Sequence, residues 1–398
     1  MLVQLLVRYA ILAAAVLVGL SWLVFVRETG GGAEGRTPAR QAPRAVAVIA
    51  VLGDDVDGHS GRLLGAHVAR VVRISLPGGR IEEKRRLGPR LRRARGGDRG
   101  ADELSFSGQL LAAAPDGLTV YALVRHGERD HIEALDATNL EPRRRYPLAR
   151  GIHYTGITLG RSGRLYAYGI RRVAVGRSVP TLTILDPDGA TIANHTVPGR
   201  TERDWSVHAG TPSAEERLFV LTYHGGNTTG ADWIDLAPGA LRRCKSRESD
   251  KACIFEIHGG VEPYRDGFLA TTGSHVVEVS RDGRVVRRLP LAPRNVHLMD
   301  FVLNRSHLYV SSCGKRPAIL RLDLARDRVQ RMRSGRFCGV PFAVGAGFLV
   351  MSADRVLRGY AGDVPRLRVI DLANPGPGVR VPHRGRPLDA VIVGASKR

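Results

Sequence analysis

Patterns typical of long amphipathic helices are absent from this sequence beyond residue 45. We also find no G-x-S-x-G, P-loop or Rossmann glycine motif, so the sequence offers no grounds for a nucleophile-elbow hydrolase, a P-loop NTPase or a dinucleotide-dependent enzyme. Instead, 47 glycines and 22 prolines are spread along the 398 residues. Such frequent breakers indicate many short strands joined by turns.

Cysteine is also scarce. The four cysteines form no C-x-x-C motif, and no histidine lies at zinc-finger spacing from them. They fall into two local pairs, Cys244 with Cys253 and Cys313 with Cys338, which predict two disulfide bonds in an oxidising compartment. The alternative is four unrelated thiols buried in the core, because free cysteine is often buried.

Acidic residues are too few to balance the basic ones, and the formal net charge is +22. The densest basic stretch runs from residue 84 to residue 99, and it has the charge to bind anionic lipid headgroups or an acidic envelope polymer. The candidate anion-binding residues are Lys84, Arg85, Arg86, Arg90, Arg92, Arg93 and Arg95. The alternative is a solvated loop of biased composition. No aromatic residues interleave this stretch, so nucleic acid is not expected as a partner.

The N-terminus carries an uncharged apolar run over residues 9–26. Its length predicts a transmembrane anchor within residues 1–26, in contact with the membrane through residues 5–26. A cleaved signal peptide is the alternative, but no small-x-small site follows the run. Residues 27–44 are rich in glycine, proline and charge and predict a flexible linker. The flanking arginines favour a cytoplasmic body, whereas the cysteine pairs favour an extracytoplasmic one, which we adopt.

A short stretch with a turn at its centre, AAAPDGLTVYAL at residues 112–123, predicts a β-hairpin, because Pro, Asp and Gly each favour tight turns. The same strand–turn–strand pattern, followed by a strand ending in an apolar residue and Asp, recurs along the chain. The regular copies cover residues 108–148, 156–199, 300–334 and 341–382, and less regular copies cover 205–257 and 261–291.

A repeat of about 40 to 50 residues with four short strands is typical of a β-propeller. In its PDG-x-x-V-Y and V/I-x-x-L-D elements the repeat resembles the YVTN and WD40-like propeller families, a resemblance that implies a shared scaffold and no particular activity. Residues 386–394 resemble an innermost strand without a blade, and residues 45–87 a blade without an innermost strand. We therefore predict an all-β, seven-bladed propeller over residues 45–394 with a composite closing blade, followed by a tail at 395–398.

Three histidines, His153, His208 and His297, precede the aromatic second-strand position at similar distances in their repeats. Some propeller lyases and lactonases use histidines and carboxylates at the channel mouth, so these three are candidate catalytic residues. The alternative is hydrogen-bonded polar residues in a wet channel. No metal or cofactor is predicted. The repeated aspartates are interpreted as turn formers: Asp136, Asp186, Asp235, Asp323 and Asp371.

Together these observations favour a membrane-tethered, extracytoplasmic propeller that binds a protein or an anionic envelope partner. The alternative function is a propeller enzyme, a lyase or a lactonase-like hydrolase, that works through the three histidines.

Overall fold

The described part of the chain contains only β-strands and the turns between them. The computed structural model describes residues 46–53, 67–91, 109–124, 130–174, 177–196, 205–209, 217–224, 228–235, 240–243, 254–255, 257–272, 275–280, 285–291, 297–313, 317–332, 337–355, 366–383 and 385–394. These residues belong to one compact unit, Ala45–Arg398. The predicted all-β propeller fold is confirmed.

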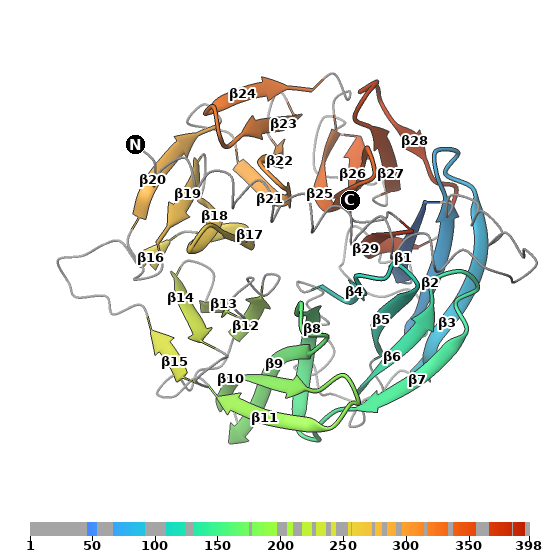
Figure 1. The fold of residues 1–398 in the computed structure, drawn as a ribbon, viewed down its shortest axis with the longest axis vertical. Helices are drawn as coiled ribbons and strands as arrows, with labels where there is room; N and C mark the ends of the chain where they lie inside the picture. Colours follow the sequence, from blue (N-terminus) through green and yellow to red (C-terminus); the bar gives the residue numbers. More distant parts are fainter. Residues whose placement is uncertain are drawn as a thin grey trace, which may run out of the picture. The chain divides into compact units, whose positions relative to one another are not determined.

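Six sheets are each built from strands that follow one another in the sequence, as the repeat predicts (Figure 1). The first three are β4(Leu111–Ala113) to β5(Thr119–Val124), β6(His131–Asp136) and β7(Pro142–Pro147); β8(Ile152–Leu159) to β9(Leu165–Ala174), β10(Arg177–Leu185) and β11(Thr191–Thr196); and β12(Trp205–Ala209) to β13(Arg217–His224), β14(Thr228–Asp235) and β15(Ala240–Arg243), with β16(Ile254–Phe255) also on β14. The next three are β17(Ile257–Tyr264) to β18(Gly267–Thr272), β19(His275–Val279) and β20(Val285–Pro290); β21(His297–Asn304) to β22(His307–Cys313), β23(Ala318–Asp323) and β24(Arg328–Arg331); and β25(Phe337–Gly345) to β26(Phe348–Arg355), β27(Arg366–Asp371) and β28(Val379–Arg380).

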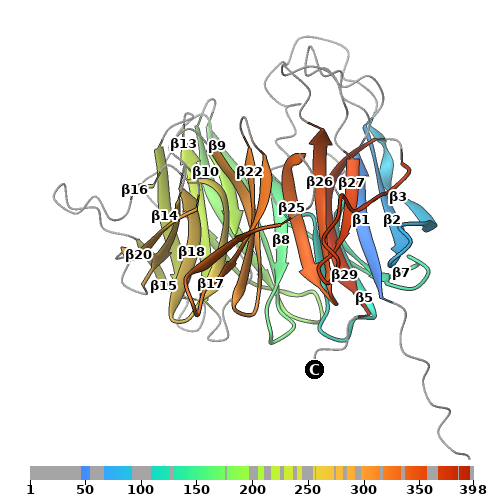
Figure 2. The same ribbon diagram turned by 90° about the horizontal axis from the view of Figure 1, so that it is seen from above.

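A further sheet combines the two ends of the propeller sequence. The strands β1(Ala47–Gly53), β2(His67–Ser75) and β3(Ile81–Leu91) pair in order, and β29(Arg386–Val393) pairs antiparallel with β1 on the inner side (Figures 1 and 2). The register runs from Ala47 opposite Val393 to Gly53 opposite Arg386. The predicted composite sheet is therefore confirmed, and we call it the closing blade.

The innermost strands contact one another in a closed ring. Around this ring β29 contacts β4, and contacts continue through β8, β12, β17, β21 and β25 back to β29 (Figure 1). The core lies between neighbouring blades, since one cluster of buried side chains joins the closing blade to β4–β7 and another joins it to β25–β28. The closing blade thus buries its two faces against its neighbours, as propeller blades require.

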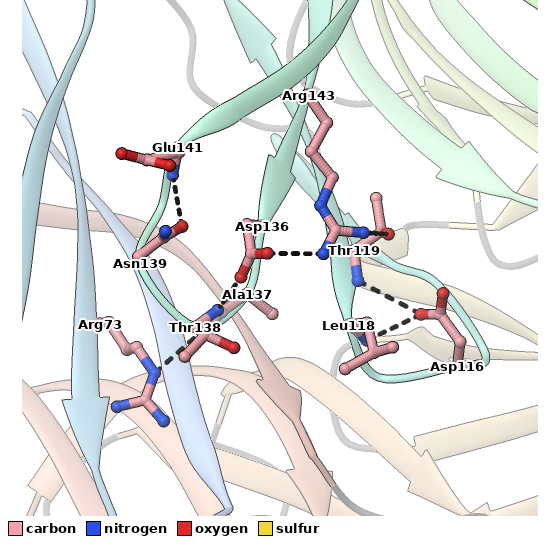
Figure 3. Close-up of polar contacts among 10 residues, drawn as sticks. All are labelled: Arg73, Asp116, Leu118, Thr119, Asp136, Ala137, Thr138, Asn139, Glu141 and Arg143. Atoms are coloured by element: carbon pink, nitrogen blue, oxygen red, sulfur yellow. Dashed lines mark hydrogen bonds and ion pairs between the residues drawn. The ribbon is translucent and has the colours of Figure 1, made fainter.

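The predicted turns form as expected in the described residues (Figure 3). Between β4 and β5, Asp116 Oδ1 accepts hydrogen bonds from the amides of Leu118 at 2.7 Å and Thr119 at 3.2 Å. Gly117 has a φ of 67°, which glycine adopts without strain. Four of the five repeated aspartates each accept a hydrogen bond through Oδ1 from a backbone amide of the following turn: Asp136 from Thr138, Asp186 from Ala190, Asp323 from Ala325 and Asp371 from Ala373. The side chain of Asp235 lies outside the described residues.

One polar contact links the closing blade to a turn of its neighbour. Arg73 on β2 donates from Nε to the carbonyl of Ala137, 3.1 Å away, in the turn that follows β6 (Figure 3). Within that neighbour, Arg143 donates to Asp136 at 2.5 Å and to the Thr119 hydroxyl at 3.3 Å. Burial raises the pKa of Asp136, but its hydrogen bonds with Arg143 and Thr138 lower it overall.

No helix among the described residues has the length and apolar character needed to cross a bilayer. The predicted anchor and linker, residues 1–26 and 27–44, lie outside the described residues, as does the tail at 395–398.

Candidate functional site

A pocket of about 600 Å³ lies between the closing blade and the blade β25–β28. Its apolar lining residues are Leu52, Val72, Ile81, Val381 and Pro382, and its basic or imidazole-bearing lining residues are Arg70, Lys84, Arg366, Arg380 and His383. No aspartate or glutamate is among these ten residues. The pocket is therefore cationic around an apolar lining, and we call it the inter-blade pocket.

Strand register places two of the cations on the wall formed by the closing blade. Lys84 on β3 pairs with Val72 on β2, and Arg86 pairs with Arg70. Directly paired residues of an antiparallel sheet share a face. Val72 is 1% exposed and packs in the core shared with the blade β25–β28, so Lys84 lies on the face toward that blade. Two like charges opposite each other, as in Arg70 and Arg86, repel and destabilise the sheet.

The opposite wall comes from β27, β28 and the segment after them. Arg366 donates from Nη1 to the carbonyl of His383 at 2.6 Å, and the amide of Leu367 donates to His383 Nε2 at 3.0 Å. Because Nε2 accepts this hydrogen bond, the neutral ring carries its proton on Nδ1. These two bonds fix His383 against the start of β27.

A second pair of like charges lies on this blade. Arg368 on β27 pairs directly with Arg380 on β28. Burial and then the charge of Arg380 lower the pKa of the Arg368 guanidinium. A lowered pKa means that the charged form is disfavoured where it is, but Arg368 itself does not line the inter-blade pocket. Both blades that form the pocket therefore carry directly opposed arginines.

Two acidic residues, one on the closing blade and one on its other neighbour, are held by cations that do not line the pocket. Glu82 forms an ion pair with Arg73. Glu133 on β6 is 4% exposed, and its Oε1 accepts from Arg145 Nη2 at 3.1 Å. Its Oε2 lies 3.5 Å from Arg85 Nη2 of the closing blade, so Glu133 joins the two blades.

His131 completes this cluster, with Nε2 3.4 Å from Glu133 Oε1. The hydrogen bond with His131 lowers the pKa of Glu133, and Arg145 and Arg85 lower it further, which outweighs the opposite effect of burial. A similar arrangement occurs at Glu278 on β19, which is 5% exposed and pairs with Arg287 at 2.8 Å and Arg265 at 3.1 Å. We interpret both clusters as structural, since each pairs one buried carboxylate with two arginines.

The structure separates the predicted anion-binding residues. Lys84 lines the inter-blade pocket, and Arg86 is exposed opposite Arg70. Arg85 lies toward the other neighbouring blade and pairs with Glu133. The backbone of Arg90 belongs to β3, but its side chain lies outside the described residues, as do Arg92, Arg93 and Arg95 entirely. The alternation of the strand thus divides a continuous basic run between two interfaces.

Sequence reasoning missed Arg70, Arg366, Arg380 and His383. Arg70 and Arg366 are almost 300 positions apart, and only closure of the ring brings their blades together. Arg380 and His383 stand in a proline- and glycine-rich segment that carries no binding motif. The one available signal was the repeat itself, which predicts that the first and last blades are neighbours.

The three candidate catalytic histidines belong to three innermost strands, as predicted: His153 to β8, His208 to β12 and His297 to β21. The strands β8 and β12 contact each other, whereas β21 contacts β17 and β25. His153 is exposed, and the side chains of His208 and His297 lie outside the described residues. Among the described residues no group of three His, Cys, Asp or Glu side chains is placed to hold a metal ion. The catalytic assignment stays a prediction.

The predicted disulfide bonds fall largely beyond what the structure describes. Cys244 and Cys253 lie outside the described residues, as do the side chains of Cys313 and Cys338. The backbone of Cys313 ends β22, and that of Cys338 is near the start of β25, which contacts β22. The amide of Gly339 donates to the Ser311 hydroxyl at 3.3 Å, so the two segments meet beside these cysteines.

Comparison with known proteins supports the fold and leaves the activity open. No family model matches the chain, and no curated protein matches it. Among solved structures, a puromycin hydrolase matches with a TM-score of 0.56 and 14% identity, covering 87% of this chain and 54% of that one. An acylaminoacyl peptidase from Pyrococcus horikoshii matches with a TM-score of 0.54 and 12% identity, covering 85% and 51%. TolB from Acinetobacter baumannii matches with a TM-score of 0.42 and 10% identity, covering 88% and 67%.

The likeness to the two hydrolases shows the β-propeller fold and no more. The chain spans about half the length of the two hydrolases, at low identity. Neither binding nor catalysis follows from such matches, because propellers share a scaffold across many functions. The YVTN or WD40-like affiliation likewise stays a prediction.

Proposed function

We propose that this protein is a binding module that recognises an anionic partner through the inter-blade pocket. The observation that carries the proposal is the lining of the pocket, in which Arg70, Lys84, Arg366 and Arg380 occur without any carboxylate. Clefts lined by charges of one sign concentrate ligands of the opposite sign. The opposed pair Arg70–Arg86 adds to this argument, because an anion bound beside Arg70 would reduce the repulsion within the pair.

The proposal includes a ring of seven blades, counted with the closing blade. Its support is the closed series of contacts between innermost strands, from β29 through β4 and on to β25. We further propose that residues 1–26 anchor the protein in a membrane and that the propeller lies outside the cytoplasm. The uncharged run at residues 9–26 and the two cysteine pairs support this placement.

The test compares binding of an anionic polymer to the wild-type protein and to two variants. Full-length protein in neutral-lipid nanodiscs is titrated with dextran sulfate at several salt concentrations. We expect Arg70→Glu with Lys84→Glu to weaken binding at least tenfold and to reduce its salt dependence.

The matched control is Arg288→Glu together with Arg328→Glu, which changes the net charge equally. Arg288 on β20 pairs with the buried Val277, as Lys84 on β3 pairs with the buried Val72, and Arg328 on β24 is also exposed. Neither control residue lines the inter-blade pocket. If both double variants lose the same affinity, the polymer binds to overall charge, and the assignment of the pocket is wrong.

A further inference from the structure

We infer that the ligand of the inter-blade pocket is an amphiphilic anion, with an apolar body against the lining and an oxyanion among the cations. This inference rests on the proposed anion-binding function and adds the chemical class of the ligand. The pocket combines two kinds of surface, because half of its ten lining residues are apolar and four of the others are Arg or Lys.

The apolar part of the lining belongs to the core between the two blades. Val72 is 1% exposed, Leu52 is 4% exposed and Val381 is fully buried, while Ile81 is partly buried against the same cluster. These side chains line the pocket and also pack with one another. The apolar surface that the lining still exposes is on Ile81 and Pro382, and an apolar group placed against these two side chains would be withdrawn from water together with that surface, which favours binding.

The charged part of the lining is more exposed. Arg70 and Lys84 are exposed residues of the closing blade, and Arg380 is an exposed residue of β28. Arginine and lysine in this setting bind carboxylate, sulfate or phosphate groups by charge-assisted hydrogen bonds. An oxyanion near these side chains would keep contact with solvent while the rest of the ligand lies deeper.

The size of the pocket favours a ligand larger than a free oxyanion. About 600 Å³ is in the range of about 300 to 1,000 Å³ that is typical of small-molecule sites. An inorganic phosphate has only five non-hydrogen atoms and would leave the exposed parts of the apolar lining, on Ile81 and Pro382, in contact with water. A ligand with an alkyl or ring body covers that lining, and each buried methylene raises affinity about fourfold.

The experiment measures equilibrium binding of a graded series of probes by dialysis. Full-length protein in neutral-lipid nanodiscs is compared with empty nanodiscs, so that partition into lipid is subtracted. The probes are inorganic phosphate, butyl phosphate, octyl phosphate and the uncharged octyl glucoside. We expect octyl phosphate to bind at least tenfold more tightly than inorganic phosphate or octyl glucoside, with butyl phosphate between them.

Two variants separate the two parts of the site. Arg70→Glu with Lys84→Glu should weaken all the phosphates at least tenfold. Ile81→Ala should weaken octyl phosphate at least fivefold and leave inorganic phosphate unchanged, because it removes apolar contact alone. Val286→Ala on the exposed face of β20 is the matched control, and thermal melts of all variants show that each is folded.

The outcomes distinguish this inference from the proposed function. If inorganic phosphate binds as tightly as octyl phosphate and both depend on Arg70 and Lys84, the proposed anion-binding function stands, but the inference that the ligand is amphiphilic is wrong. If octyl glucoside binds as tightly as octyl phosphate, the pocket is merely apolar and both proposals are wrong. If no phosphate binds, both are wrong as well. Nanodiscs that contain anionic lipid show where the natural ligand comes from. If the anionic lipid displaces octyl phosphate, the ligand is a membrane lipid, and if octyl phosphate is not displaced, the ligand is free in solution.

Discussion

Replacement of Asp389 by alanine should weaken closure of the ring. Asp389 lies on β29 and is 5% exposed, and its Oδ2 accepts a hydrogen bond from the amide of Leu111 on β4 at 2.8 Å. Its Oδ1 accepts a second bond from the amide of Ala390 at 2.7 Å. The carboxylate thus joins the closing blade to the next blade at the innermost strands, where the chain ends meet.

The size of the effect follows from what the alanine would leave behind. A hydrogen bond to a charged group contributes about 1.5–3 kcal/mol, and an unpaired buried donor costs about 1–3 kcal/mol. Both ranges include the cost of leaving the Leu111 amide without an acceptor, so they cannot simply be added. We expect Asp389→Ala to lower the free energy of unfolding by about 2–4 kcal/mol. Asp389→Asn keeps an acceptor oxygen for the Leu111 amide and should recover part of this loss.

The assay is equilibrium unfolding in urea, followed by tryptophan fluorescence and by far-UV circular dichroism to test for a single transition. Asp371→Ala is the control, because Asp371 Oδ1 accepts from the Ala373 amide at 2.8 Å in an exposed turn. That variant should lose about 1 kcal/mol or less. Hydrogen exchange of the Leu111 amide should quicken only in the Asp389 variant. Equal stability losses in the two alanine variants, with unchanged exchange at Leu111, would refute the reasoning.

Three other predictions concern the closing blade, the ion cluster around Glu133 and the cysteines. Ending the chain at Gly385 removes β29 with its buried side chains Leu388 and Val393, each of which contributes about 1.5–3 kcal/mol. The truncated protein should therefore lose its cooperative thermal unfolding transition. A transition like that of the wild type would contradict closure of the ring by β29. Glu133→Gln should destabilise at neutral pH. Because the folded-state pKa of Glu133 is lowered, its carboxylate stabilises above the ordinary value of 4.5, and the difference from wild type should shrink as pH falls through the folded-state pKa; a pH-independent difference in urea unfolding would speak against this. Non-reducing peptide mapping should find Cys313 linked to Cys338, and free thiols there would remove the main argument for an extracytoplasmic body.

Much of the fold could be predicted from the sequence because its signals are local. The turn at Pro115, Asp116 and Gly117 needs only those residues, and its hydrogen bonds form within the turn. The aspartates after the third strands behave in the same way. A repeat of such local signals predicts the same sheet each time, and the unpaired strand at residues 386–394 then predicts closure.

The candidate site could not be predicted in the same way, because its residues meet through register and ring closure. Nothing in the basic run indicates that Lys84 lies toward one blade and Arg85 toward the other, since this depends on the alternation within β3 and on a register shift beside it. The buried Glu133 that binds Arg85 stands in an apolar strand about 50 residues away. Charge patterns along the sequence therefore predicted an anion-binding region, whereas the arrangement of the folded blades decides which of its residues line the inter-blade pocket.

The pairing of β29 with β1 also sets an order on folding during synthesis. Each of the six sheets of consecutive strands can form as soon as its own strands have left the ribosome. The first three strands of the closing blade are made before all of these, yet their inner partner is made after all of them. Until then the inner edge of β1, with its backbone amides and carbonyls, has no partner strand, which is the condition in which unrelated chains pair with a sheet. The interval between synthesis of β1 and of β29 is therefore when we expect this protein to depend most on chaperones.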